Sequence, residues 1–285
     1  MNSPPAEWAT VVVVAEPDEV ELVTSLLWDA GVAGIEEIDQ PDGRVELRAG
    51  CTADVVDDVR RVLTARFTVG VQSTAADAGL DDWRDHAAAW RAGERFVVVP
   101  AWQAPPDWVT GSDIALVIDP AHSFGSGSHP TTRLCLAAIE RTVRPGTTVA
   151  DIGCGSGVLS IAAARRGAVE VQAVDIEADA VAATVANADR NGVGAIVRAS
   201  DVSPAALAAG TFDVVVANIG AGALRSMAVE LAALLASDGV LVLSGVLTAQ
   251  ADEVRSAFEA TGLVLVGSAV DEDWVALELR HAVNG

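Results

Sequence analysis

The chain has 285 residues, of which 51% are hydrophobic, and its 18 basic and 40 acidic side chains give a formal net charge of −22. The length favours two domains, and no apolar run reaches the ~18 residues that a membrane helix needs. Direct binding to nucleic acid is not expected, because the chain is strongly acidic and shows no basic patch.

The first 76 residues show the order β-α-β-β-α-β. Strand patterns cover 8–15, 32–38, 44–48 and 68–73, and helix patterns cover 17–28 and 53–66. This order is that of a ferredoxin-like unit. Nothing in it looks catalytic, so two interpretations stay open: a substrate-recognition domain, or a module for packing and oligomerisation.

Residues 77–93 are predicted as a linker helix that carries Trp83 and Trp90 and follows a small, polar boundary. The remaining residues, 94–285, are predicted to form a second domain. Its first two strand patterns, 96–99 and 114–118, flank a cluster of Trp and Pro side chains that we expect to pack a domain junction.

A polar, glycine-rich segment then runs from Asp119 to Thr132 and precedes a helix pattern over 132–141. It contains Phe124, His122 and His129, so it is more than a linker, although His129 is equally explained as a residue bonded to the backbone. No metal site is expected, because the four histidines and three cysteines have no ligand spacing. Widely separated cysteines and the lack of a signal-peptide pattern favour the reducing cytoplasm.

From residue 148 the pattern alternates strand and helix, which predicts a mostly parallel sheet covered on both faces. Strand patterns cover 148–151, 171–175, 195–199, 212–218, 240–244, 263–267 and 274–279; helix patterns cover 158–166, 178–190, 221–236 and 249–261. Only residues 268–273 separate the last two strands. A parallel crossover needs more residues, so the final strand is predicted to be antiparallel.

The first of these strands ends in Asp151-Ile152-Gly153-Cys154-Gly155-Ser156-Gly157, directly before a helix. Glycines let a backbone turn tightly beside a ligand, and the following helix N-terminus offers unpaired N–H groups. The next strand ends in Asp175, whose carboxylate can accept hydrogen bonds from two ribose hydroxyls. The segment therefore predicts a nucleoside site, but its third glycine comes one residue earlier than in the dinucleotide G-x-G-x-x-G motif.

This arrangement, with Asp151, the glycine triplet, Asp175, Asp201 and a reversed last strand, resembles Rossmann-like S-adenosylmethionine methyltransferases. Within that class, the segment from Phe124 to Thr132 resembles an F-G-T-G-x-H-x-T-T loop, and Val216-Ala217-Asn218-Ile219 resembles a V-A-N-I strand end. Both motifs are those of the PrmA-type ribosomal protein L11 methyltransferase family. The chain departs from the family at Ser126, which keeps the hydroxyl, and after Ile219, where Gly220-Ala221-Gly222-Ala223-Leu224 replaces Leu-Ala-Gly-Pro-Leu.

The resemblance implies a cofactor role for each matching position. Gly153, Gly155 and Gly157 would admit the methionine part of S-adenosylmethionine, and Asp151 would bind its ammonium group directly or through water. Asp175 would hold the ribose, and Asp201 would meet the adenine edge unless it is only a turn residue. The residues expected to close over the methionine end are Phe124, Gly125 and Thr132.

On the acceptor side, the Asn218 side chain and the Ile219 carbonyl would accept hydrogen bonds from an amine, and Asn218 would also border the cofactor. The resemblance implies a cytoplasmic, monomeric enzyme that methylates lysine ε-amines, and also the N-terminal α-amine, of ribosomal protein L11, free or on the ribosome. Two alternatives remain: a methyltransferase for another protein lysine or a small amine, and a non-catalytic S-adenosylmethionine-binding module.

Overall fold

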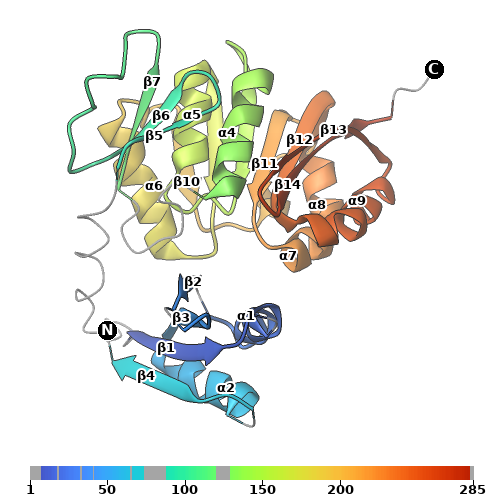
Figure 1. Cartoon of the computed structure of the whole chain (residues 1–285). Helices are drawn as coiled ribbons and strands as arrows, with labels where there is room; N and C mark the ends of the chain where they lie inside the picture. Colours follow the sequence, from blue (N-terminus) through green and yellow to red (C-terminus); the bar gives the residue numbers. More distant parts are fainter. Residues whose placement is uncertain are drawn as a thin grey trace, which may run out of the picture. The chain divides into compact units, whose positions relative to one another are not determined.

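The computed structural model describes residues 8–17, 19–32, 34–40, 42–64, 66–73, 88–119 and 129–282. The chain forms two compact units, residues 1–87 and residues 88–285 (Figure 1). No helix among these described residues is long and apolar enough to cross a membrane.

The first unit is a four-stranded antiparallel sheet with the spatial order β2-β3-β1-β4. Its elements are β1 (Trp8–Ala15), α1 (Val20–Asp29), β2 (Gly34–Asp39), β3 (Val45–Thr52), α2 (Ala53–Leu63) and β4 (Val69–Ser73). Alternation along β1 explains why the helices cover one face: Val11 and Val13 are fully buried, whereas Thr10 and Val12 are half-buried. The predicted β-α-β-β-α-β order agrees with these elements.

The second unit contains a seven-stranded sheet with the order β10-β9-β8-β11-β12-β14-β13. Its strands are β8 (Thr148–Ile152), β9 (Glu170–Val174), β10 (Val197–Ser200), β11 (Phe212–Asn218), β12 (Leu235–Leu247), β13 (Leu263–Asp271) and β14 (Trp274–His281). The strands from β8 to β12 are parallel, and β14 pairs antiparallel with both β12 and β13. The predicted fold class, including the antiparallel last strand, is confirmed.

Six α-helices, two 3-10 turns and a small second sheet complete this unit within the described residues. They are β5 (Trp90–Ala92), β6 (Phe96–Pro100), β7 (Ile114–Ile118), α4 (Pro130–Thr142), α5 (Val158–Arg166), α6 (Ala178–Arg190), η1 (Pro204–Ala206), α7 (Ala221–Ser226), α8 (Ala228–Leu234), η2 (Thr248–Gln250) and α9 (Ala251–Glu259). The helix predicted over 221–236 is divided at Met227, and its last residues, from Leu235, already belong to β12.

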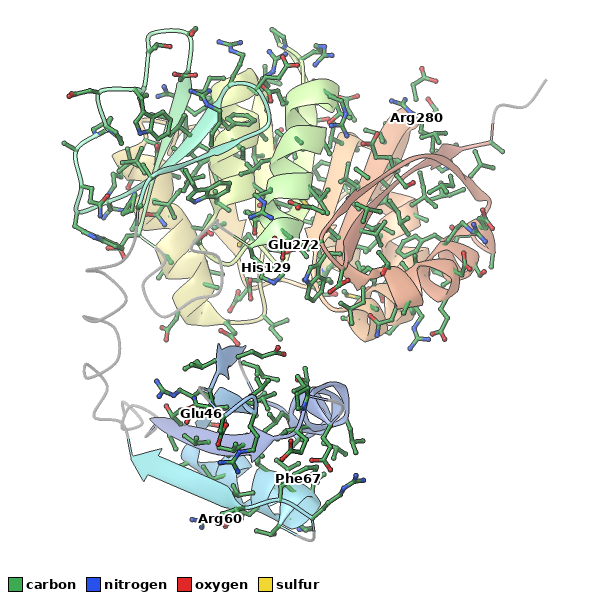
Figure 2. The ribbon with its side chains drawn as sticks, in the orientation of Figure 1. Glu46, Arg60, Phe67, His129, Glu272 and Arg280 are labelled. Carbon is green, nitrogen blue, oxygen red and sulfur yellow. The ribbon has the colours of Figure 1, made fainter. Side chains whose placement is uncertain are left out.

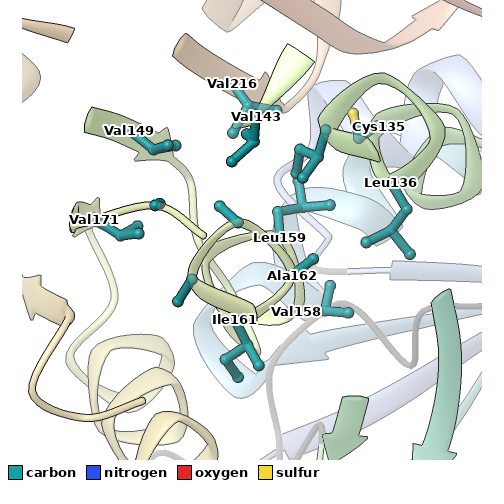
Figure 3. Packing of buried hydrophobic residues seen from close by; sticks show 14 of the residues in the cluster. Cys135, Leu136, Val143, Val149, Val158, Leu159, Ile161, Ala162, Val171 and Val216 are labelled. Atoms are coloured by element: carbon teal, nitrogen blue, oxygen red, sulfur yellow. The ribbon is translucent and has the colours of Figure 1, made fainter. Parts of the chain in front are cut away.

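Two apolar layers hold the large sheet between its helices. One layer contains buried side chains of α4, α5 and the small sheet, and the other contains those of α7, α8 and α9. Figure 3 shows the first layer around α5, with Val149 and Val171 of the large sheet on one side and Leu136 of α4 on the other. Because both faces of the sheet are covered, the carboxyl ends of its parallel strands are the edge where a ligand can enter.

The predicted linker helix over 77–93 needs a correction at its end. Residues 77–87 lie outside the described part of the chain, but Trp90–Ala92 form strand β5 and not helix. They pair with β6 through a tight turn in which Gly93 has a φ of +61°, a conformation that glycine adopts easily. The three residues therefore belong to the second unit.

Candidate functional site

The glycine turn, residues 153–157, connects β8 to α5 at the carboxyl edge of the sheet. Gly153, Gly155 and Gly157 have φ values of +74°, +53° and +79°, in the left-handed region that favours glycine. The N–H groups of Gly153 and Cys154 donate to the Val174 carbonyl at 2.8 and 3.1 Å, which fixes the turn against β9. The N-terminus of α5 follows at once and leaves backbone donors toward this edge.

Two of these glycines also have no room for a side chain. A Cβ on Gly153 would lie 2.4 Å from Ile219 Cγ2, and a Cβ on Gly157 would lie 2.9 Å from side-chain atoms of Thr184. Glycine is thus required here by close packing as well as by φ, as the sequence motif predicts.

Asp175 follows β9 and faces the glycine turn. Its Oδ2 accepts a hydrogen bond from the Gly155 N–H at 2.9 Å, and its Oδ1 accepts one from the Glu177 N–H at 3.1 Å. Each carboxylate oxygen has a second lone pair, so both can still accept a hydrogen bond from a hydroxyl group. The next side chain, Ile176, is 95% exposed, which places an apolar surface beside this carboxylate.

Asp151 lies beneath the turn and is completely buried. Its Oδ2 accepts a hydrogen bond from the Ser160 hydroxyl at 2.6 Å, while its Oδ1 has no partner within the described residues. Burial raises the pKa of this carboxyl group from 3.8 to about 6. A buried acceptor without a partner costs free energy, which a bound donor would recover.

Asn218 ends β11, in register with Ser244 of β12, and is half-buried. No hydrogen bond joins its side-chain amide to the part of the chain that the structure describes. The following residue, Ile219, donates its N–H to the Ser244 carbonyl at 3.2 Å, and its backbone lies against Gly245. The predicted acceptor pair therefore stands at the carboxyl edge, in contact with the glycine turn through the Ile219 side chain.

The start of α4 lies close to the tip of the β13–β14 hairpin. His129 caps the helix, and its Nδ1 accepts a 3.4 Å hydrogen bond from the Thr131 N–H. The centroids of its ring and of the Trp274 ring lie 4.9 Å apart in an edge-to-face arrangement. Burial lowers the pKa of the imidazole. Arg133 binds Asp271 at 2.7 Å and Glu272 at 2.9 Å, and Figure 2 shows Glu272 beside His129.

The other predicted site residues are placed as follows. Thr132 is buried in the first turn of α4. Asp201 is exposed directly after β10, the strand that pairs with β9. Phe124 and Gly125 lie outside the described residues. The structure thus brings Asp175 and Ile219 into contact with the glycine turn that follows Asp151.

A polar stripe on α6 was not predicted as part of the site. Thr184, Asn187 and Asn191 are buried, and two of them contact the glycine turn: the Thr184 hydroxyl donates to the Gly155 carbonyl at 3.0 Å, and the Asn187 amide donates to the Ser156 carbonyl at 2.9 Å. Their spacing of three and four residues places them on one helix face, otherwise lined by alanines. That spacing was the available signal.

The site fits S-adenosylmethionine on its own geometry. It combines a glycine cradle that side chains would fill, a carboxylate one strand away that can accept further hydrogen bonds, and a buried Asp151 oxygen that no described residue pairs with. On a sheet with an antiparallel last strand, these features define a Rossmann-like S-adenosylmethionine-dependent methyltransferase.

Comparison with known proteins narrows this class. The family model described as "Ribosomal protein L11 methyltransferase (PrmA)" matches residues 52–282. The protein of that name from Pelotomaculum thermopropionicum is 36% identical over 308 residues, with 96% of this chain and 99% of the relative covered. The one from Dechloromonas aromatica is 48% identical over 187 residues, 66% of this chain and 60% of the relative.

A solved structure agrees with these sequence matches. The crystal structure of a ribosomal protein L11 methylase from Lactobacillus delbrueckii subsp. bulgaricus superposes with a TM-score of 0.62 and 31% sequence identity, and the match covers 68% of this chain and 99% of that one. The chain belongs to the ribosomal protein L11 methyltransferase (PrmA) family, whose methyl donor is S-adenosylmethionine.

Proposed function

We propose that this chain methylates ribosomal protein L11, on lysine ε-amines and also on the N-terminal α-amine. The observation that carries this proposal is the position of Asn218: its amide has no hydrogen-bond partner among the described residues, and it lies at the carboxyl edge next to Ile219, which touches the glycine turn. Methyl transfer requires the amine acceptor to bind directly beside the methyl donor, and this arrangement would place them there. The identity of the acceptor comes from the ribosomal protein L11 methyltransferases to which the chain is similar.

On the donor side, each residue acts through the contacts already described. Asp175 holds two vicinal hydroxyls while its Gly155 hydrogen bond keeps the carboxylate in place. The exposed side chains of Ile176 and Val202 flank Asp175 and Asp201 and offer apolar contact to a flat base. Asp151 meets the ammonium group from beneath the turn, directly or through one water, with its unpartnered Oδ1.

On the acceptor side, the reaction needs a neutral amine. When bound, S-adenosylmethionine would supply a sulfonium methyl group. The amine nitrogen attacks the methyl carbon, the carbon–sulfur bond breaks so that S-adenosylhomocysteine leaves, and the amine proton passes to water. A lysine with a pKa of about 10.4 is neutral at pH 7 at a cost of roughly 4–5 kcal/mol. The Asn218 side-chain oxygen and the Ile219 carbonyl accept the amine N–H bonds and aim its lone pair, so positioning supplies most of the catalysis.

The remaining parts of the chain fit a protein acceptor. The antiparallel unit that contains residues 8–73 holds its own core and recognises the substrate. A net charge of −22 attracts a basic protein and disfavours nucleic acid, so the contact is with L11 itself, free or on the ribosome. A ribosomal acceptor places the enzyme in the cytoplasm, and we expect it to act as a monomer.

Mass spectrometry of L11 tests the acceptor. Incubation of unmethylated L11 with the enzyme and S-adenosylmethionine should add 14 Da steps, and L11 from cells that lack the gene should lose them. An unchanged L11 mass in both experiments would exclude this acceptor. Parallel incubation with fractionated cell protein and with small amines then identifies a different acceptor, and S-adenosylhomocysteine binding without any methylation would indicate a non-catalytic module.

A further inference from the structure

The buried polar stripe of α6 joins the glycine turn to strand β7. Thr184, Asn187 and Asn191 are 0%, 1% and 8% exposed. A buried polar side chain destabilises the fold unless it is hydrogen-bonded, so the partners of these three residues show what the stripe holds together.

Asn187 contacts both elements at once. Its Nδ2 donates to the Ser156 carbonyl in the glycine turn at 2.9 Å and to the Asp119 carbonyl after β7 at 2.7 Å. Its Oδ1 accepts from the Asp119 N–H at 3.0 Å and from the Arg190 guanidinium. Both N–H donors and both acceptor positions of the amide are therefore used.

The two neighbouring polar residues each contact only one of these elements. Asn191 pairs with Val117 of β7, accepting from its N–H at 2.9 Å and donating to its carbonyl at 2.7 Å. It also donates to the Asn187 carbonyl within α6. Thr184 donates to the Gly155 carbonyl of the turn. The two asparagines thus hydrogen-bond Val117 of β7 and Asp119, one residue past its end, which are alternate residues such as an adjacent strand would bond.

We propose that Asn187 is a positioning residue for the methyl donor, because its hydrogen bonds fix the position of the glycine turn relative to the residue that follows β7. This inference rests on the proposed role of the turn in holding the cofactor. The Thr184 and Asn187 hydrogen bonds hold the carbonyls of Gly155 and Ser156, and therefore the two peptide planes that carry the N–H groups of residues 156 and 157. A small displacement of such a turn weakens every hydrogen bond that it makes to a ligand.

The experiment compares Asn187→Ala with its matched control, Asn191→Ala. Both variants remove a buried amide and two hydrogen bonds to the backbone of residues 117–119, but only the first loses the bond to Ser156. Calorimetric titration with S-adenosylhomocysteine, well below both melting temperatures, measures the dissociation constant. We expect a rise of tenfold or more for Asn187→Ala and a change within twofold for Asn191→Ala, despite similar losses in melting temperature.

Kinetics give a second readout that general destabilisation would not produce. The KM for S-adenosylmethionine should rise in Asn187→Ala, while the KM for the methyl acceptor stays within twofold. Asn187→Ser, which replaces the amide with a single hydroxyl that can donate one hydrogen bond, should recover part of the affinity and serves as the test variant if the alanine variant does not fold. Equal dissociation constants for the Asn187 and Asn191 variants would overturn the inference, whereas failure of the unmodified protein to bind S-adenosylhomocysteine would overturn the cofactor site itself.

Discussion

Gly153 and Ile219 are in direct contact although they follow different strands, β8 and β11. A Cβ on Gly153 would lie 2.4 Å from Ile219 Cγ2, and the Ile219 carbonyl would lie at the same distance from a Cβ on Gly245. Ile219 is therefore held between two glycines that both have positive φ. Through this contact the glycine turn and the Ile219 carbonyl keep a fixed separation, as the proposed transfer from a donor on the turn to an amine at that carbonyl requires.

Gly153→Ala should destabilise the protein and weaken donor binding. The left-handed backbone costs alanine about 1–2 kcal/mol, and displacement of the Ile219 side chain adds a further loss. Gly192→Ala is the matched control, because Gly192 has a φ of +69° and no atom within 4 Å of its added Cβ. Urea unfolding measures both variants. A Gly153→Ala variant no less stable than the Gly192→Ala control would show that the Ile219 contact is not restrictive.

Asp175→Asn should preserve the conformation of the glycine turn but lose a hydrogen bond to the ribose of the cofactor. The amide oxygen can still accept the Gly155 N–H, but the amide nitrogen cannot accept a hydroxyl. Loss of a hydrogen bond to a charged group corresponds to about 1.5–3 kcal/mol, or roughly 10- to 150-fold weaker S-adenosylhomocysteine binding by calorimetry. Asp213→Asn, which alters a carboxylate bonded to the Thr148 N–H at the opposite edge, should bind normally. Equal affinities for both variants would exclude Asp175 from the site.

The sequence predicted those features that depend on local pattern and spacing. The glycines at 153, 155 and 157 predict a turn because all three adopt positive φ values, which glycine adopts easily. This preference belongs to the residue itself and does not depend on contacts with distant residues. The antiparallel last strand could be predicted from the length of one connection alone, since the segment between β13 and β14 is too short for a parallel crossover. Trp90–Ala92 were predicted as helix because three residues carry too little periodicity to distinguish the two structures.

Contacts between distant segments had no such signal. Asn187 meets Asp119 across 68 positions, and Arg133 meets Asp271 across 138. Such pairs depend on how helices pack on the sheet, which periodicity does not specify. The sequence therefore predicted the residues that we expect to face the cofactor, whereas Asn187 and Thr184, which hydrogen-bond the glycine turn, became visible only in the fold.

The buried Asp151 should make stability depend on pH. Its pKa in the folded protein, about 6, is above its ordinary value of 3.8, so the folded state binds the proton more tightly than the unfolded state. The free energy of unfolding therefore falls as pH rises from about 4 through 6, by about 3 kcal/mol in total, and about half of this loss develops between pH 5 and pH 8. Urea unfolding from pH 5 to pH 8 should show this loss of stability in the unmodified protein but not in Asp151→Asn, which has no carboxyl group to titrate.

Ser160→Ala provides the second arm of that experiment. The Ser160 hydroxyl donates to Asp151 and lowers the pKa of that carboxyl group, so its removal should raise the pKa further and steepen the loss of stability above pH 6. A stability difference between the unmodified protein and Asp151→Asn that stays constant from pH 5 to pH 8 would mean that Asp151 does not titrate in this range.

Asn218→Ala separates methyl transfer from donor binding. The side chain ends β11 with an amide that the described residues leave without a partner, so its removal breaks no bond within this part of the fold. Loss of one hydrogen bond that aims the amine should reduce kcat by about 100-fold, or roughly 2.7 kcal/mol in the barrier. S-adenosylhomocysteine binding should stay within a few-fold, because the glycine turn and Asp175 are untouched. Asn218→Gln, which keeps the amide but moves it by one methylene, should also be slow if position matters. Full turnover in Asn218→Ala would assign the amine to another group, and the loss of donor binding with unchanged kcat would make Asn218 a cofactor ligand only.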